Sequence, residues 1–153
     1  MISLLIVNYR SASLAADAIR TAREGTSTPL QVVVVDNSCS EAGQLRPLAD
    51  AVITPDKNLG YAGGINLGRR SCEGTTLIVS NPDVTFAPGA LDLLHHADAA
   101  VAGPRRGHPG PRCRTGQTNH SPALLVAHQL PQLRGDLRAG GVFSAGRRLM
   151  FIF

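Results

Sequence analysis

The stretch that decides the fold is Leu30-Gln31-Val32-Val33-Val34-Val35-Asp36-Asn37-Ser38. Its four consecutive valines predict a strand that is buried on both faces, because a strand with one solvated face alternates apolar and polar residues. Strands of this kind occur in parallel sheets whose two faces are covered by helices. The stretch therefore predicts a central strand of a parallel sheet, with a polar loop that starts at Asp36.

The segments on both sides repeat the pattern of an apolar run, a polar end and a helix-forming segment. The predicted strands cover residues 2–7, 30–35, 51–54 and 75–80. The predicted helices cover residues 11–23, 38–49, 88–98 and a glycine-rich segment that ends at Arg70. Residues 100–103 are expected to add a fifth strand. Strands that alternate with helices predict an α/β fold with a mostly parallel sheet and helices on both faces.

Composition limits the class of protein. The chain has 153 residues, of which 43% are hydrophobic and 17% are charged, and this is typical of one globular domain. Aromatic residues are scarce, with no Trp, two Tyr and four Phe. A stacking platform for single-stranded nucleic acid is therefore not expected.

Charge divides the chain into two parts. Residues 1–103 carry seven Lys and Arg against ten Asp and Glu, whereas residues 104–153 carry eight Arg against a single acidic residue, Asp136. The second part is also rich in Pro and Gly. We expect a ligand-binding domain over residues 1–103 and an irregular, poorly ordered basic tail over residues 104–153. No motif in the tail predicts specific binding to nucleic acid.

Cysteine usage and hydropathy suggest a location. The three cysteines, Cys39, Cys72 and Cys113, have no metal-binding spacing and are odd in number, so reduced thiols are expected. The apolar run after Met1 is too short for a signal sequence, and no run is long enough to span a membrane. We expect a cytoplasmic protein, with peripheral contact to the cytoplasmic face of a membrane left open.

Polar residues follow each predicted strand. In open parallel sheets, ligands bind outside the carboxyl ends of the strands. Carboxylate and amide side chains there can bind a base or ribose hydroxyls, and glycines let the backbone approach a ligand. A carboxylate after a buried strand can also hold a divalent cation. The candidate residues are Asn8, Tyr9, Asp36, Asn58, Gly60, Gly63, Gly64, Asn66, Asn81 and Asp83.

These elements together resemble family 2 glycosyltransferases. The resemblance rests on Val7-Asn8-Tyr9, on Asp36-Asn37-Ser38, on the asparagine- and glycine-rich stretch 58–68 and on Asn81-Pro82-Asp83. It covers about residues 1–103, and the subgroup most similar contains the rhamnosyl- and galactofuranosyltransferase-like enzymes. Each motif alone is weak. Their shared order carries the resemblance.

The resemblance implies a GT-A fold and a nucleotide-diphosphate-sugar donor of the UDP or dTDP type. It places Asn8 and Asp36 at the nucleoside and stretch 58–66 along the base and sugar. Asn81 and Asp83 form a D-x-D-like motif in which Asp83 holds Mg²⁺ or Mn²⁺. Transfer would go with inversion to a glycan or lipid-linked acceptor in cell-wall or polysaccharide synthesis. Local sequence alone leaves a turn role for Asp83 equally open.

The resemblance also requires a general base in the C-terminal half of the family fold. After Asp98 the chain offers Asp136 alone, in a context unlike the family's acceptor region. We therefore expect a truncated or altered version that holds the donor half and is inactive or weakly active. A non-catalytic nucleotide-binding module is the alternative. A dinucleotide-dependent oxidoreductase is disfavoured because no glycine fingerprint follows the first predicted strand.

Overall fold

The computed structural model describes residues 1–101 and 148–152, with backbone alone for residues 97–101 and for Arg148. In these residues one sheet contains the strands β1 (Ile2–Asn8), β2 (Leu30–Asp36), β3 (Ala51–Ile53), β4 (Thr76–Ser80) and β5 (Arg148–Ile152). The helices are α1 (Ala12–Gly25), α2 (Ala42–Leu45), α3 (Gly60–Gly68) and α4 (Ala90–Val101), with a short 3-10 turn η1 (Arg69–Ser71).

The strand order is β3-β2-β1-β4-β5, and every pair of neighbours is parallel. The predicted parallel α/β architecture is thus confirmed. In the register, Asn8 lies opposite Asp36, and Ile6 lies opposite Ser80. All carboxyl ends therefore lie along one edge of the sheet, which we call the carboxyl edge.

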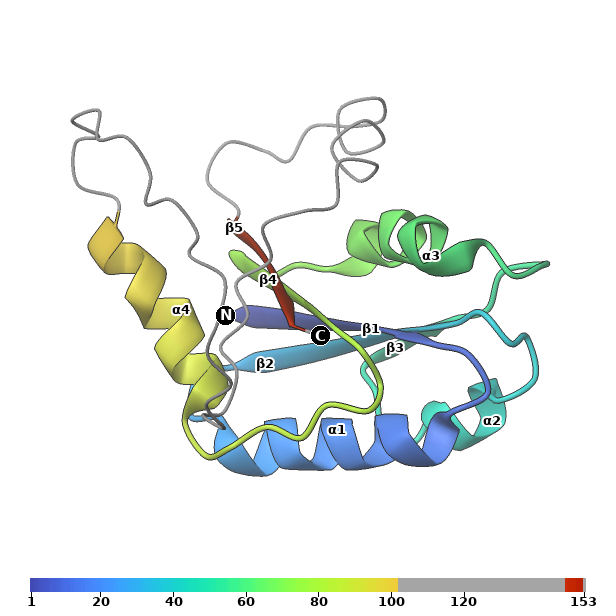
Figure 1. Cartoon of the computed structure of the whole chain (residues 1–153), viewed down its shortest axis with the longest axis horizontal. Coiled ribbons are helices and arrows are strands. Elements are labelled where there is room, and N and C mark those ends of the chain that lie inside the picture. The colour runs from blue at the N-terminus through green and yellow to red at the C-terminus, as the bar shows by residue number, and fades with distance from the viewer. Residues whose placement is uncertain (102–147, 153) are drawn as a thin grey trace, which may run out of the picture.

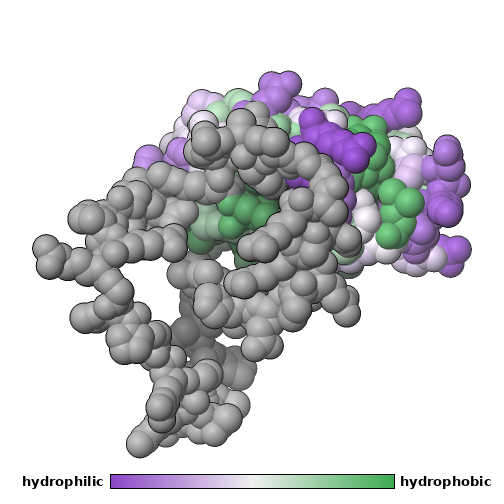
Figure 2. Space-filling model, turned by 90° about the horizontal axis from the view of Figure 1, so that it is seen from above, coloured by the Kyte–Doolittle hydropathy of each residue, from purple (hydrophilic) through white to green (hydrophobic). Residues whose placement is uncertain are grey.

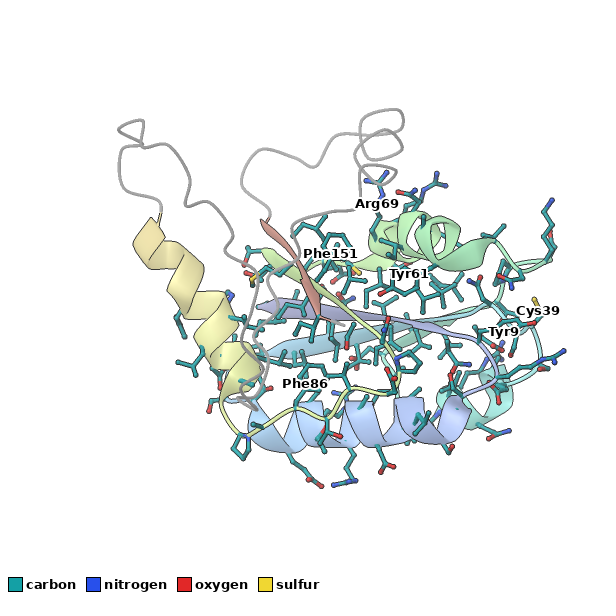
Figure 3. The ribbon with its side chains drawn as sticks, in the orientation of Figure 1. Tyr9, Cys39, Tyr61, Arg69, Phe86 and Phe151 are labelled. Carbon is teal, nitrogen blue, oxygen red and sulfur yellow. The ribbon has the colours of Figure 1, made fainter. Side chains whose placement is uncertain are left out.

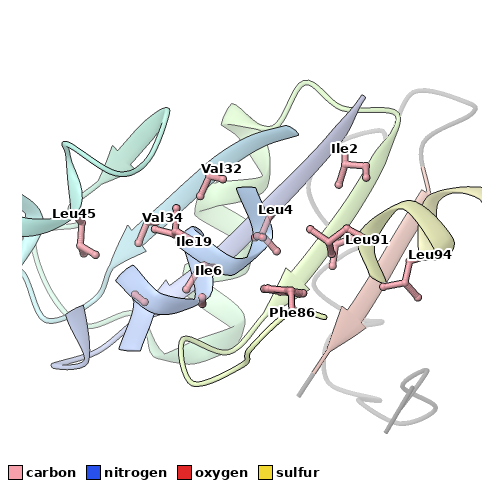
Figure 4. Close-up of a cluster of buried hydrophobic side chains, with 14 of the residues drawn as sticks. Ile2, Leu4, Ile6, Ile19, Val32, Val34, Leu45, Phe86, Leu91 and Leu94 are labelled. Atoms are coloured by element: carbon pink, nitrogen blue, oxygen red, sulfur yellow. The ribbon is translucent and has the colours of Figure 1, made fainter. Parts of the chain in front are cut away.

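Helices cover both faces of the sheet, with α1 below it and α3 above it in Figure 1. On the α1 side, the core packs side chains of β1 and β2 against α1, Phe86 and α4 (Figure 4). On the α3 side, the other faces of the same strands pack against Ile65 and Cys72. The valines of β2 are fully buried because both faces are covered, as their pattern predicted.

Helix α1 faces the sheet with small residues. Ala15, Ala18 and Ala22 are fully buried, at the spacing of one helix face. Alanine has the highest helix propensity and loses no side-chain entropy on burial, so the same residues favour the helix and its close contact with the sheet. In the part of the chain that the structure describes, no helix combines the length and apolarity needed to cross a bilayer.

The surface above α3 is uneven in polarity. Figure 2 views the molecule from that side, and hydrophilic residues line its outer rim, with hydrophobic residues between them toward the right-hand end. The loops of the carboxyl edge lie at the same end in Figure 1. Their exposed residues include Arg10, Asp56 and Asp83, so the edge predicted to bind a ligand presents charged groups.

Two predicted elements differ from the structure. The fifth strand predicted at residues 100–103 is wrong for Ala100 and Val101, which continue α4; residues 102 and 103 lie outside the described part. The alanine-rich run before Gly103 favours a helix that continues past Asp98. Helix α2 ends at Leu45 instead of near Ala49, because Pro47 has no N–H to continue the helix.

The fifth strand comes from the end of the chain. Residues 148–152 were expected to belong to an irregular tail, and this prediction is wrong for them, since they form β5 beside β4. The apolar run Leu149-Met150-Phe151-Ile152 is typical of a strand, and an open edge at β4 gives it backbone partners. The remainder of the predicted tail, including Asp136, lies outside the described residues, and the boundary near Pro104 stays a prediction.

Candidate nucleotide-sugar site

The carboxyl edge brings together loops that are distant in sequence. These loops are residues 9–11 after β1, 37–41 after β2, 54–59 between β3 and α3, and residues 81–83 at the start of the segment 81–89 that connects β4 to α4. Figure 3 shows Tyr9 and Cys39 from the first two loops at this end of the molecule, and Tyr61 between α3 and the sheet. The parallel topology thus places the sequence-predicted residues along one edge.

Asn8 and Asp36 lie side by side at the ends of β1 and β2, and both are fully buried. Asn8 Nδ2 donates to Glu41 Oε2 at 2.8 Å and more weakly to Asp36 Oδ1 at 3.4 Å. Asn8 Oδ1 accepts from Ser11 Oγ at 2.9 Å. Both polar groups of Asn8 are therefore used within the chain. This arrangement favours a positioning role, and direct contact of Asn8 with a nucleoside stays a prediction.

Asp36 is equally well bonded. Its Oδ1 accepts from Ser38 N and Ser38 Oγ, and its Oδ2 accepts from Glu41 N at 2.8 Å. Burial raises the pKa of Asp36, but the hydrogen bonds from Ser38, Glu41 and Asn8 together outweigh it and lower the pKa below its usual value. Asp36 is therefore a stable carboxylate that shapes the loop after β2. Its contact with a ribose or base stays a prediction.

Tyr9 and Arg10 form the accessible part of the first loop. The side chain of Tyr9 is 50% exposed, and the Arg10 guanidinium lies 5.4 Å from its ring centre. Arg10 has a φ of 54°, in the left-handed region that non-glycine residues rarely adopt. An aromatic ring and a cation are thus presented together at the carboxyl edge, where they can stack on a base or approach a phosphate.

Asn37 connects the second loop to α3. Its side chain is buried, and its Nδ2 donates to Gly60 O at 2.9 Å, while its Oδ1 accepts from Leu59 N at 3.5 Å. Asn58 Oδ1 accepts from Gly60 N at 2.8 Å. Gly60 has a φ of 69°, and a side chain would meet nothing within 4 Å, so its requirement for glycine is conformational. These bonds fix the start of α3.

The next glycines serve close packing. A Cβ on Gly64 would lie 2.7 Å from Val7 Cγ1, and one on Gly68 would lie 2.4 Å from Leu5 Cδ1. A Cβ on Gly63 would lie 2.8 Å from Leu59 Cβ. Gly64 and Gly68 therefore let α3 approach the sheet. Ligand contact by Gly63 and Gly64 stays a prediction.

Asn66 lies further along α3. Its Oδ1 is buried and has no hydrogen-bond partner among the residues that the structure describes. Asn66 lies six residues after Gly60, the first residue of α3, and is thus more than one helical turn from the loop before the helix. Its predicted role along the sugar is not tested by these contacts and stays a prediction.

Asn81 and Asp83 follow β4. Asn81 N donates to Ile152 O at 3.3 Å, so β5 anchors the start of this loop. Asp83 is exposed, and its charge acts on Tyr61 in the first turn of α3. Burial, and then the charge of Asp83, raise the pKa of Tyr61 to about 12. The charge of Asp83 therefore reaches Tyr61 electrostatically, and the raised pKa keeps the Tyr61 phenol neutral.

Within the described ranges, no cluster of three or more His, Cys, Asp and Glu side chains could hold a metal by protein ligands alone. This does not conflict with the predicted cation. Mg²⁺ at substrate phosphates is usually bound by one or two carboxylates, and waters and phosphate oxygens complete its shell. The exposed Asp83 carboxylate fits that requirement.

Sequence reasoning did not select two residues that organise this site. Glu41 is not among the candidate residues, and Asn37 enters only within the stretch Asp36-Asn37-Ser38. In the structure, Glu41 connects the first two loops and Asn37 connects the second loop to α3. Their spacing after a buried strand was visible, but their partners are distant in sequence, so pattern alone did not reveal them.

Comparison with known proteins agrees with this geometry. The model of glycosyl transferase family 2 matches residues 3–145. N-acetylglucosaminyl-diphospho-decaprenol L-rhamnosyltransferase of Mycobacterium tuberculosis is 32% identical over 130 residues, which cover 74% of this chain and 41% of that protein. The chain thus spans about two fifths of the length of this relative.

Solved structures share the fold. Mannosyltransferase PcManGT from Pyrobaculum calidifontis, in complex with GDP-Man and Mn²⁺, has a TM-score of 0.55 at 22% identity, over 67% of this chain and 32% of that one. S. aureus TarS has a TM-score of 0.53 at 19% identity, over 71% and 38% of the two chains. The family match covers most of the chain and includes the loops of the carboxyl edge. The chain belongs to glycosyltransferase family 2 and has an α/β fold of the GT-A type.

Proposed function

We propose that the carboxyl edge binds a nucleotide-diphosphate sugar as the donor for sugar transfer with inversion. The observation that carries the proposal is the convergence of four polar loops at one edge of a parallel sheet. Tyr9 and the start of α3 would bind the nucleoside and sugar, and Asp83 would lie at the diphosphate. The complexes of PcManGT with GDP-Man and of TarS with UDP-GlcNAc support a ligand of this class.

The curated relative supports a finer assignment. Its name describes transfer of rhamnose to a lipid-linked acceptor. We therefore propose a UDP- or dTDP-linked donor, a lipid-linked or glycan acceptor in cell-wall or polysaccharide synthesis, and a cytoplasmic location at the membrane surface. A peripheral position is sufficient for an enzyme whose acceptor lies in the bilayer.

Asp83 is the residue proposed to hold Mg²⁺ or Mn²⁺. When bound, such a cation stabilises the negative charge that develops on the leaving diphosphate. The chain contributes an exposed carboxylate at the end of β4, and its loop is held by the hydrogen bond from Asn81 N to Ile152 O.

The base that deprotonates the acceptor is not assigned to any described residue. A non-catalytic module would bind the nucleotide without transferring the sugar, so donor binding and transfer are measured separately. Transfer is followed with a radiolabelled donor and a lipid-linked acceptor, and binding is followed by thermal unfolding. Binding without transfer would support the module, whereas both together would support the enzyme.

The binding test uses UDP, dTDP and GDP, each with Mn²⁺ and with EDTA. A nucleotide at 100 times its dissociation constant should stabilise the fold by about 2.7 kcal/mol. We expect this stabilisation to require both Mn²⁺ and Asp83, and to be lost in Asp83→Ala. Glu73→Ala is the matched control, because Glu73 is an exposed carboxylate that precedes β4 at the opposite edge of the sheet. If none of the three nucleotides stabilises the wild-type protein, the proposal is wrong.

A further inference from the structure

A single carboxylate oxygen joins the first two loops of the carboxyl edge. Glu41 Oε2 accepts from Asn8 Nδ2 at 2.8 Å and from Ser11 N at 3.0 Å. The backbone N–H of Glu41 in turn donates to Asp36 Oδ2 at 2.8 Å. Glu41 is thus bonded to the ends of both central strands, although it belongs to neither.

The two donors, Asn8 Nδ2 and Ser11 N, flank the accessible part of the site. Asn8 and Ser11 are the residues on either side of Tyr9 and Arg10, so the Glu41 carboxylate holds both ends of this two-residue turn. Arg10 has a φ of 54°, a conformation that persists only where surrounding contacts hold it. The bonds to Glu41 are contacts of this kind.

The side chain of Ser11 makes no capping hydrogen bond to α1, although Ser11 is the residue before the helix. Its hydroxyl donates to Asn8 Oδ1 instead, and its N–H donates to Glu41. The carboxylate therefore lies at the positive end of the α1 dipole, where a negative charge is favourable. Glu41 thus contributes to stability, and the test must separate that effect from positioning.

We propose that Glu41 is a positioning residue for the donor nucleotide, acting through the turn that presents Tyr9 and Arg10. This inference rests on the proposed function, because it assumes that Tyr9 and Arg10 face the donor. Glu41 itself is partly buried, and its carboxylate is directed to Asn8 and Ser11. Loss of the carboxylate would release the turn and lower affinity for the nucleotide.

The test uses the fact that both hydrogen bonds to the Glu41 side chain end on the same oxygen, Oε2. The amide oxygen of Glu41→Gln has two lone pairs and can accept both hydrogen bonds, whereas Glu41→Ala accepts neither. Arg23→Ala is the control for stability, because Arg23 bonds to Leu48 O and Asp50 on the other side of α1 and contacts none of the turn residues. If Glu41→Ala does not fold, Glu41→Asp replaces it, since the shorter side chain withdraws the carboxylate from Ser11 N.

Two quantities are measured at a temperature where every variant is folded. Calorimetry gives the dissociation constants of UDP and dTDP with Mn²⁺, and NMR gives the hydrogen exchange rate of the Ser11 amide. We expect Glu41→Ala to weaken binding roughly five- to tenfold, as loss of one or two hydrogen bonds predicts, and to accelerate exchange at Ser11. Glu41→Gln should bind within about threefold of wild type, a difference smaller than one hydrogen bond. Arg23→Ala should lower the melting temperature and change neither quantity.

The outcomes separate the two proposals. If the wild-type protein binds neither nucleotide, the proposed function fails for these donors, and the positioning role fails with it. If the wild type binds but Glu41→Ala binds equally well, Glu41 is structural and this inference alone is wrong. Equal weakening by Arg23→Ala would likewise assign the effect to stability and overturn it.

Discussion

The two halves of the carboxyl edge are built differently. At the ends of β1 and β2, Asn8 and Asp36 are fully buried and hydrogen-bonded within the chain. After β4, Asp83 is exposed and follows Pro82 in the segment that leads to α4. The first half is therefore arranged before any ligand binds, whereas the second half keeps a carboxylate available. This difference fits a site that recognises a nucleoside with rigid loops and binds a cation together with the diphosphate.

The most direct way to break this comparison is to remove each carboxylate. Asp36→Ala leaves the N–H groups of Ser38 and Glu41 and the hydroxyl of Ser38 without their acceptor. We expect a loss of about 3 kcal/mol in the free energy of unfolding, because several buried donors lose a charged partner. Asp83→Ala, at an exposed position, should change it by less than about 0.5 kcal/mol. Urea unfolding of both variants measures the difference, and equal losses would refute the comparison.

The attachment of α3 gives the next largest effect. A Cβ on Gly68 would overlap Leu5 Cδ1 and Val35 Cγ2, both in the core, so Gly68→Ala should destabilise the protein by about 1–3 kcal/mol through overpacking. Gly43→Ala is the control, because a Cβ there meets nothing within 4 Å and Gly43 lies in α2. It should be neutral or stabilising by up to about 1 kcal/mol. Equal destabilisation by the two substitutions would show that the contact at Gly68 does not decide the outcome.

Much of the fold could be predicted from the sequence, because many elements are specified by short runs of neighbouring residues. The valines of β2, the alanines of α1 and the turn at Gly60 carry their structure in short patterns. Two features that the sequence did not reveal, strand β5 and the role of Glu41, depend on contacts between distant segments. Strand β5 needs the free edge of β4, which lies about 70 residues earlier in the chain. The partners of Glu41 at Asn8 and Ser11 became visible only when β1 and β2 were paired.

The dependence of stability on acidic pH tests the buried carboxylate of Asp36 directly. The pKa of Asp36 is lowered on folding, so its carboxylate contributes stability above its unfolded pKa, near 3.9, and this contribution is lost as the pH falls through the folded pKa. The pKa of Asp92 is also lowered, to about 2, chiefly by the Ser27 N–H. The experiment therefore uses an Asp92→Asn background, which removes the contribution of Asp92 to the pH dependence. In that background, Asp36→Asn should flatten the loss of stability below pH about 4, measured by urea unfolding against pH. An unchanged slope would remove Asp36 from the acid response.

The smallest effect tests whether the two halves of the edge communicate. Burial and then the charge of Asp83 raise the pKa of Tyr61 from 10.0 to about 12. Because the folded pKa is the higher one, the neutral phenol contributes stability below pH about 10, and this contribution is lost as the pH rises through the folded pKa. Tyr9 and Tyr61 are the two tyrosines of the chain, so Tyr9→Phe leaves Tyr61 as the sole phenol in an ultraviolet titration.

In that background, Asp83→Ala should lower the pKa of Tyr61 by less than about one unit, since burial is the larger cause of the shift. Asp56→Ala removes an exposed carboxylate from the loop before α3 and should leave the titration unchanged. A titration that does not respond to Asp83→Ala would mean that the charge of Asp83 does not act on α3, and the two halves would then act independently.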